Sequence, residues 1–133
     1  MTCIICELNP LHNGHKYLID AASDDNVVLI MSGNYTQRGS AAVFDKYTRA
    51  KAAIIAGADL VVELPFPWCS AGAADFAAAG VRIASALGAN RLVFGSGSGN
   101  AELLSKAGEA FAKEDFDSAF ATASKSDPAE GAA

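Results

Sequence analysis

Four short apolar runs along the chain predict buried β-strands. Inside each run the positions are apolar rather than alternating with polar ones, which is typical of strands that are covered on both faces. Asn, Pro or Gly follows each run and ends it. The predicted strands are residues 2–7, 27–31, 60–63 and 91–94.

The segments between these runs predict helices. Tyr17, Leu18 and Ala21 share one face of the first helix, which indicates packing against a sheet. Asp45 fits the N-cap of the second helix, and Gly57 follows its end. The predicted helices are residues 14–23, 45–56 and 71–87, followed by two weaker ones at 101–112 and 115–123.

Strands that alternate with helices in this way predict an α/β fold. Parallel strands with right-handed crossovers form a doubly wound, Rossmann-like sheet in three layers. The length of 133 residues fits one domain, residues 1–133. Because ligands bind at the carboxyl ends of such strands, the segments 9–15 and 95–98 are expected at the same edge of the sheet.

The composition is that of a folded protein. Hydrophobic residues make up 51% of the chain and charged residues 19%, which excludes a disordered protein. The apolar runs are too short to span a membrane. No basic segment precedes the first apolar run, so we expect no signal peptide and a cytoplasmic location.

The formal net charge is −5, and acidic residues outnumber basic ones most clearly beyond Asn100. A protein that binds nucleic acid through its own charge needs a basic face. The nearest candidate is a local basic stretch, and a solvated helix face explains part of it equally well. This basic stretch comprises Arg38, Lys46, Arg49 and Lys51.

The three cysteines are predicted to be core residues. Cys3 and Cys6 have the C-x-x-C spacing of redox and zinc sites. In a strand, however, side chains three positions apart point to opposite faces, so the two thiols would diverge. The sequence has no second cysteine pair to complete a zinc site, and an odd number argues against a disulfide framework.

The candidate chemistry lies where the first strand meets the first helix. A helix N-terminus offers unpaired N–H groups and the positive end of the helix dipole, which suit a phosphate. Gly14 has no Cβ, so a nucleotide can approach the backbone there. His12 and His15 can direct both imidazoles at one anionic group.

This arrangement favours phosphoryl or nucleotidyl transfer, in which the protein positions groups and stabilises charge. His12 and His15 are the candidate catalytic residues, donating hydrogen bonds to the oxygens of the α-phosphorus. The alternatives are an exposed pair without function and one half of a metal site. We predict a phosphate site and no metal site, because the only two histidines of the chain share the loop after the first strand.

Other polar and aromatic positions carry weaker predictions. Asp59 and Glu63 flank the third strand too far apart for joint chemistry; Asp59 fits a turn, and Glu63 could border the cleft. Phe66 and Trp68 could stack an adenine or a cytidine, or serve as core or interface anchors. The glycine–serine segment 95–99 could cradle a phosphate or be an ordinary loop.

Several segments resemble a known family. His12-Asn13-Gly14-His15 matches the H-x-G-H signature of the nucleotidyltransferase superfamily. Within it, residues 2–96 are similar to the tRNA(Met) cytidine acetate ligases, with matching segments in the family's order and spacing. These segments are residues 7–10, 31–39, 45–50, 59–65 and 92–96.

The resemblance implies an activity and its substrates. Such an enzyme activates acetate with ATP to acetyl-adenylate and then acetylates N4 of the wobble cytidine of elongator tRNA(Met). ATP, accompanied by Mg²⁺ on its phosphates, acetate and the tRNA are therefore the expected ligands. The resemblance does not indicate an oligomeric state.

The resemblance also implies site residues. Those expected to bind ATP are Ile5, Cys6, Glu7, Leu8, Asn9, Pro10, Leu11, His12, Asn13, Gly14, His15, Lys16, Tyr17, Leu18 and Gly95. From their positions after the second and fourth strands, further residues are expected to reach the cleft. These are Ser32, Asn34, Gln37, Arg38 and Ser96.

The chain departs from the family pattern in two respects. Gly97 stands where the family usually has an acid. Family members are also considerably longer, and their further nucleotide contacts and basic tRNA-binding region have no counterpart here. We therefore expect a chain that is truncated relative to the family, and two alternatives stay open: a non-catalytic nucleotide-binding module, and an adenylyl- or cytidylyltransferase for a small metabolite.

Overall fold

A computed structural model describes residues 1–23 and 25–112. The chain divides into two compact units, Met1–Gly95 and Ser96–Ala133, and the first holds all the strands of the described part. The expected helix at 115–123 lies outside the described residues, and the single domain 1–133 stays a prediction. The elements are β1 (Thr2–Cys6), α1 (Asn13–Ala21), β2 (Val27–Ser32), α2 (Lys46–Ile55), β3 (Leu60–Leu64), the 3-10 helix η1 (Trp68–Ser70), α3 (Ala73–Ala86), β4 (Arg91–Leu92) and α4 (Ala101–Phe111).

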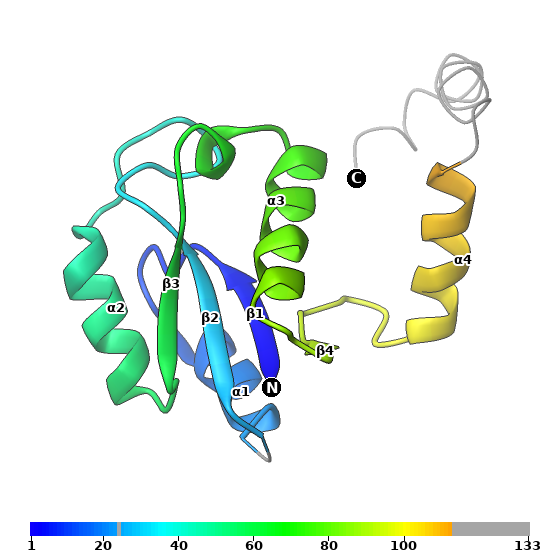
Figure 1. The fold of residues 1–133 in the computed structure, drawn as a ribbon, viewed down its shortest axis with the longest axis horizontal. Coiled ribbons are helices and arrows are strands. Elements are labelled where there is room, and N and C mark those ends of the chain that lie inside the picture. The colour runs from blue at the N-terminus through cyan, green and yellow to red at the C-terminus, as the bar shows by residue number, and fades with distance from the viewer. Residues whose placement is uncertain (24, 113–133) are drawn as a thin grey trace. The chain divides into compact units, whose positions relative to one another are not determined.

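The strands form one parallel sheet in the order β3-β2-β1-β4 (Figure 1). β1 pairs with β2 from Thr2↔Val27 to Cys6↔Met31, and with β4 at two positions. The predicted α/β class and Rossmann-like parallel sheet are confirmed. The last strand is shorter than predicted: Val93 still donates its N–H to the Cys3 carbonyl at 3.0 Å, but regular pairing ends at Leu92.

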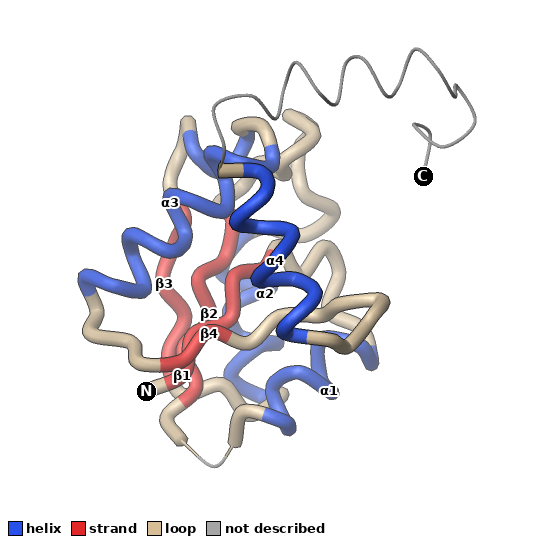
Figure 2. The backbone as a smooth tube through the Cα atoms, turned by 90° about the vertical axis from the view of Figure 1, so that its right-hand side faces the viewer, coloured by secondary structure: helices blue, strands red, loops and turns tan. Residues whose placement is uncertain are grey.

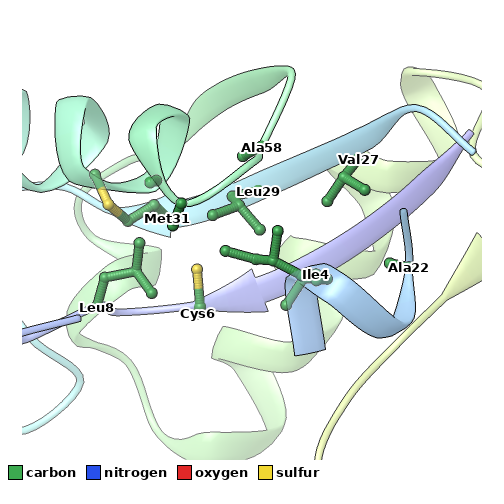
Figure 3. Close-up of a cluster of buried hydrophobic side chains, with 11 residues drawn as sticks. Ile4, Cys6, Leu8, Ala22, Val27, Leu29, Met31 and Ala58 are labelled. Atoms are coloured by element: carbon green, nitrogen blue, oxygen red, sulfur yellow. The ribbon is translucent and has the colours of Figure 1, made fainter. Parts of the chain in front are cut away.

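Helices cover both faces of the sheet. α1 and α2 pack on one face through a core that includes Ile4, Leu29 and Met31 (Figure 3). α3 packs on the other face against a second core that includes Val28 and Ile30. In Figure 2 the strands lie between α3 on one side and α1 and α2 on the other, so the three-layer arrangement is confirmed.

The cysteines follow the alternation of strand side chains. Cys3 belongs to the core on the α3 face and Cys6 to the core on the α1 and α2 face. Both thiols are free, as is that of Cys69, and all three are buried. Burial raises the pKa of Cys6 to about 12, so this thiol stays protonated and unreactive at neutral pH.

Side-chain caps mark where α1, α2 and α4 begin. Asp45 accepts hydrogen bonds from the backbone N–H groups of Tyr47 at 2.9 Å and Thr48 at 3.0 Å, which confirms the predicted N-cap of α2. In the second unit, the Asn100 carboxamide accepts the N–H of Leu103 at 3.0 Å and caps α4. α1 begins differently, with a histidine cap that belongs to the candidate site.

Gly80 sets how closely α3 can approach the sheet. A Cβ at this position would lie 2.6 Å from the Ile5 Cδ1 and 2.9 Å from two further atoms of the same side chain. The obstructing atoms include Cγ1 and Cγ2, close to the Ile5 backbone, so they cannot swing aside as the end of a long side chain would. The helix therefore packs on β1 only because this position has no side chain.

The Gly80→Ala substitution is expected to lower the free energy of unfolding by about 1–3 kcal/mol through overpacking. This would occur although alanine is the better helix former. Urea denaturation of the wild type and the variant measures the difference. Gly108→Ala, inside α4 at a position where a Cβ meets nothing within 4 Å, is the control and should not lower stability, because alanine is the better helix former. Equal stability of Gly80→Ala and wild type would contradict the proposed close contact.

Candidate functional site

The loop between β1 and α1 carries the two histidines. It starts at Leu8, whose side chain is 1% exposed although its φ angle is 50°, a left-handed conformation that side-chain-bearing residues rarely adopt. The turn at Leu8 leads the chain out of the sheet at the carboxyl end of β1. His12 is exposed and His15 is half-buried, so neither imidazole is enclosed in the core.

The two imidazoles cap α1 reciprocally. The His12 Nδ1 accepts the backbone N–H of Gly14 at 3.1 Å, and the His15 Nδ1 accepts the backbone N–H of His12 at 3.2 Å. This is a capping box in which histidines replace the usual Ser or Thr and Glu or Gln. The rings stack with their centroids 3.8 Å apart and their planes inclined by 28°. The backbone thereby fixes the orientation of both rings.

These bonds determine where the imidazole protons lie. A neutral imidazole whose Nδ1 accepts a hydrogen bond carries its proton on Nε2. His12 and His15 therefore each keep one N–H donor, at Nε2, that no residue of the described part of the chain accepts. Two donors on stacked rings are available to one anionic ligand.

One sequence expectation about the helix start needs correction. The N–H of Gly14, expected to be unpaired, is bound by His12, and the N–H groups of His15 and Lys16 reach the His12 carbonyl at 2.9 and 3.1 Å. A glycine at position 14 is also favoured by the cap itself, because a Cβ there would lie 3.0 Å from the His12 Cε1. The glycine makes room for the capping ring.

Burial lowers the pKa of His15, and the neighbouring His12 lowers it further. At neutral pH the His15 side chain is therefore uncharged and can accept the His12 N–H at Nδ1. Protonation of that nitrogen would turn the acceptor into a donor and break the cap.

The buried side chain of Arg49 joins the loops of the site through hydrogen bonds. Its side chain is 2% exposed, and all its hydrogen bonds go to segments that leave the sheet at the carboxyl edge. The guanidinium donates to the carbonyls of Glu7 at 2.6 Å, Phe44 at 3.0 Å and Gly33, and Nη1 lies 3.4 Å from the Ser32 Oγ. One buried cation therefore joins the exits of β1 and β2 and the entrance of α2.

Two further bonds join the loop after β1 to the segment 33–45. The Glu7 Oε1 accepts the Gln37 N–H at 2.5 Å, and the Asn9 Oδ1 accepts the Val43 N–H at 2.7 Å. The sequence separations are 30 and 34 residues. The two loops therefore form one rigid edge beside the histidine pair.

The residues expected to reach the cleft from this segment have different environments. Ser32 is fully buried beneath the edge, which removes its hydroxyl from the surface. The Asn34 Oδ1 accepts the backbone N–H of Lys46 at 3.1 Å, so this oxygen already has a partner within the protein. Gln37 is half-buried, and Arg38 is exposed. Ser96 belongs to the second unit, and its place in the cleft stays a prediction.

The stretch expected to bind ATP divides in the same way. The Cys6 and Leu8 side chains are buried in the core under α1, and Ile5 packs toward α3. At these positions only backbone groups could face a nucleotide. Lys16 forms an ion pair with Asp20. Besides Ile5, Glu7 and Lys16, the residues whose side chains are exposed or half-buried are Asn9, Pro10, Leu11, His12, Asn13, His15, Tyr17 and Leu18.

Gly95 lies at the end of the first unit, after β4. Because β4 runs parallel to β1, the segments that follow these two strands leave the sheet at the same edge. A Cβ at Gly95 would meet nothing within 4 Å, and its φ is not in the left-handed region. Within residues 1–23 and 25–112, neither space nor backbone conformation requires a glycine at this position, and its place against a nucleotide stays a prediction.

The remaining candidates have structural partners. Glu63 forms an ion pair with Lys46 at 2.6 Å, and the Asp59 carboxylate accepts the Val27 N–H at 2.8 Å. With Lys46 paired and Arg49 buried, the basic stretch presents only Arg38 and Lys51 as unpaired surface cations in the described region. Residues 1–23 and 25–112 contain no group of three or more potential metal ligands. None of the helices in these residues could cross a membrane.

A parallel doubly wound sheet with an H-x-G-H motif at the end of its first strand defines a class, the nucleotidyltransferases. The family model of the HIGH nucleotidyl transferases matches residues 1–129, and the chain belongs to this family.

The most informative relatives are tRNA(Met) cytidine acetate ligases. Those of Lactobacillus delbrueckii subsp. bulgaricus and Streptococcus pneumoniae are 50% and 56% identical over 96 and 97 residues, covering 69% and 72% of this chain. The alignments cover 25% and 26% of the relatives, so the chain spans about a quarter of their length. The resemblance seen in the sequence is confirmed.

A solved structure supports the same relationship. The crystal structure of Thermotoga maritima TmcAL bound with alpha-thio ATP matches with a TM-score of 0.76 and 39% sequence identity. The match covers 79% of this chain and 27% of the other. A relative with the same fold thus binds an ATP analogue.

Sequence reasoning missed the role of Arg49. Its charge and its place in a helix made it look like part of a basic surface. The one available signal was its position: it lies four residues after the Asp45 cap, and three apolar or small residues, Ala50, Ala52 and Ala53, follow on the inner side of the helix. That pattern places Arg49 near the buried face, but it does not reveal that the guanidinium binds the carbonyls of Glu7, Gly33 and Phe44.

Replacing Arg49 by methionine is expected to lower the free energy of unfolding by about 3 kcal/mol, because three buried or part-buried carbonyls lose a charged donor. Chemical denaturation measures the change. Lys51→Met, at an exposed position of the same helix, is the control and should lie within about 0.5 kcal/mol of wild type. Similar values for the two variants would show that the guanidinium does not hold the loops.

The cap predicts a pH dependence of stability. Because the folded-state pKa of His15 lies below the ordinary 6.5, the folded protein binds fewer protons than the unfolded chain as the pH falls below that value. Stability from this group is complete above pH 6.5 and is lost as the pH falls through the folded pKa. His15→Gln keeps a capping acceptor but does not titrate.

Urea denaturation of wild type and His15→Gln at about pH 7.5 and about pH 5.5 tests this, because both conditions avoid the carboxylate titrations. We expect the wild type to lose stability relative to the variant at the lower pH. A constant difference between the two proteins would mean that His15 does not titrate in the cap.

Proposed function

We propose that this chain is the ATP-binding portion of an adenylate-forming acetate ligase that acts on tRNA(Met). In the proposed reaction an acetate oxygen attacks the α-phosphorus of ATP, the bond from that phosphorus to the bridging oxygen breaks, and pyrophosphate leaves. The N4 amine of the wobble cytidine then attacks the acetyl carbonyl, forming the amide and releasing AMP and a proton. Mg²⁺ would arrive with the phosphates of the nucleotide.

The observation that carries the proposal is the reciprocal cap of His12 and His15. Both Nδ1 atoms are engaged by the backbone, so both Nε2–H groups are donors of fixed orientation at the carboxyl edge of β1. Donors that need no rearrangement stabilise the charge that builds up on a transferring phosphorus. The geometry thus supports a role in binding the α-phosphate, with Gly95 against the nucleotide.

The relatives favour the ligase over other nucleotidyl transfers. Those named above are tRNA(Met) cytidine acetate ligases, and the neighbour of known structure binds alpha-thio ATP. Because the chain spans about a quarter of their length, a non-catalytic nucleotide-binding module is a second candidate. An adenylyl- or cytidylyltransferase for a small metabolite is a third, supported only by the shared H-x-G-H motif.

ATP–pyrophosphate exchange that depends on acetate is the direct test. We expect exchange by the wild type and a loss of about 10²–10³-fold in His15→Ala, the usual cost of removing one such donor. Ser85→Ala, an exposed position on α3, should exchange like wild type. Calorimetry with ATP on the same proteins shows whether binding is retained.

Each outcome separates the candidates. Exchange that is unchanged in His15→Ala would remove the histidines from the reaction. ATP binding without exchange at saturating acetate would favour the non-catalytic module. Turnover of a phosphorylated metabolite with ATP or CTP, in the absence of tRNA and acetate, would favour the third candidate.

A further inference from the structure

Two large aromatic side chains stand exposed at the carboxyl edge of the sheet. Phe66, in the segment after β3, is 71% exposed, and Tyr35, in the segment after β2, is 51% exposed. Their ring centroids lie 6.4 Å apart with the planes inclined by 60°. Neither ring belongs to the two core clusters. The fold therefore holds two aromatic rings together in solvent without using them for packing.

The backbone on both sides of this pair is well fixed. Tyr35 forms an antiparallel bridge with Ala41, and the Thr36 N–H reaches the Ser40 carbonyl at 2.9 Å. Phe66 stands between Pro65 and Pro67, just before η1. Rings on such supports lose little conformational entropy when a ligand covers them, which favours a binding role over chance exposure.

The aromatic pair lies beside the histidine site. The strand order β3-β2-β1-β4 places β2 directly next to β1, and the bonds from Glu7 to Gln37 and from Asn9 to Val43 join the Tyr35 segment to the loop that leads to His12. In Figure 1 the segments after β2 and β3 meet at the same end of the sheet. In the proposed site the nucleotide lies near β4, on one side of β1. The aromatic pair follows β2 and β3, on the other side of β1, which is left for the acceptor.

An exposed cation lies on the same segment as Tyr35. Arg38 lies three residues after Tyr35, is exposed, and has no hydrogen-bond or ion-pair partner among residues 1–23 and 25–112. Exposed rings next to an arginine are the combination that binds single-stranded nucleic acid, because bases stack on the rings and the guanidinium contacts a phosphate. An aliphatic or acidic partner would leave one of these two features unused.

We propose that Tyr35 and Phe66 form a stacking surface for an unpaired nucleotide of the acceptor RNA, and that Arg38 contacts its backbone phosphate. This inference rests on the proposed function, since it assigns the acceptor side of the same site. It names candidate substrate-binding residues outside the histidine loop, on the segments that follow β2 and β3.

The test measures the affinity of the whole chain for a fluorescently labelled RNA stem-loop with cytidine at the first anticodon position, by anisotropy at low salt. Phe66→Leu and Tyr35→Leu should each bind about tenfold more weakly, the usual scale of one base–aromatic stack. Arg38→Gln should weaken binding and reduce its salt dependence by about one released ion. Ile55→Ala removes a side chain that is 77% exposed at the opposite end of α2, and should bind like wild type.

Two further measurements test the inference. A fully paired RNA duplex should bind the wild type more weakly than the stem-loop, because its bases cannot stack on the rings. Calorimetry with ATP should give the same affinity for Phe66→Leu and wild type. Equal binding of duplex and stem-loop, or wild-type RNA affinity in both leucine variants, would overturn the stacking surface, as would the absence of RNA binding by the wild type.

The same measurements separate this inference from the proposed function. If Phe66→Leu lost affinity for ATP as strongly as for RNA, the rings would belong to the nucleotide site, and the acceptor assignment would fail. If exchange depended on acetate and His15 but the leucine variants bound RNA normally, the stacking surface alone would be wrong. If the variants lost RNA affinity and no exchange occurred, the surface would stand and the ligase reaction would fail.

Discussion

The buried guanidinium of Arg49 is the interaction on which the functional edge of this protein depends. Loops after parallel strands are not paired to one another by the sheet, so something else must hold them in register. Here a single buried cation binds three carbonyls from two such loops, those that follow β1 and β2. A charged donor binds carbonyls more strongly than a neutral one and compensates for its own burial through several bonds. Arg49 thereby holds the loops at this edge together, although they contain little regular secondary structure.

On that edge the histidine pair is organised locally. Each imidazole gives one nitrogen to the backbone and keeps the other for a ligand, so the start of α1 and the candidate chemistry are the same structure. Gly14 is part of this design because it leaves space for the ring of His12.

The sheet, its parallel direction and the position of the histidines could be predicted because they follow from local patterns of apolar runs, caps and breakers. The place of Arg49 could not, since the carbonyls it binds are 42 and 16 residues away in sequence at Glu7 and Gly33. The carboxamide of Asn34, which is expected at the cleft, also accepts the backbone N–H of Lys46, and sequence spacing does not reveal this bond. The contact between Tyr35 and Phe66 likewise depends on the order of the strands.

The left-handed turn at Leu8 has a consequence for how this protein can change over evolutionary time. The position requires a backbone conformation that suits glycine or asparagine, and at the same time a large apolar side chain that fills the core. Glycine would relieve the backbone but leave a cavity, and asparagine would bury an amide. Any successful replacement must therefore be accompanied by a second change nearby. The backbone conformation and the burial of this residue, which directs the chain toward its histidines, thus favour different residue types.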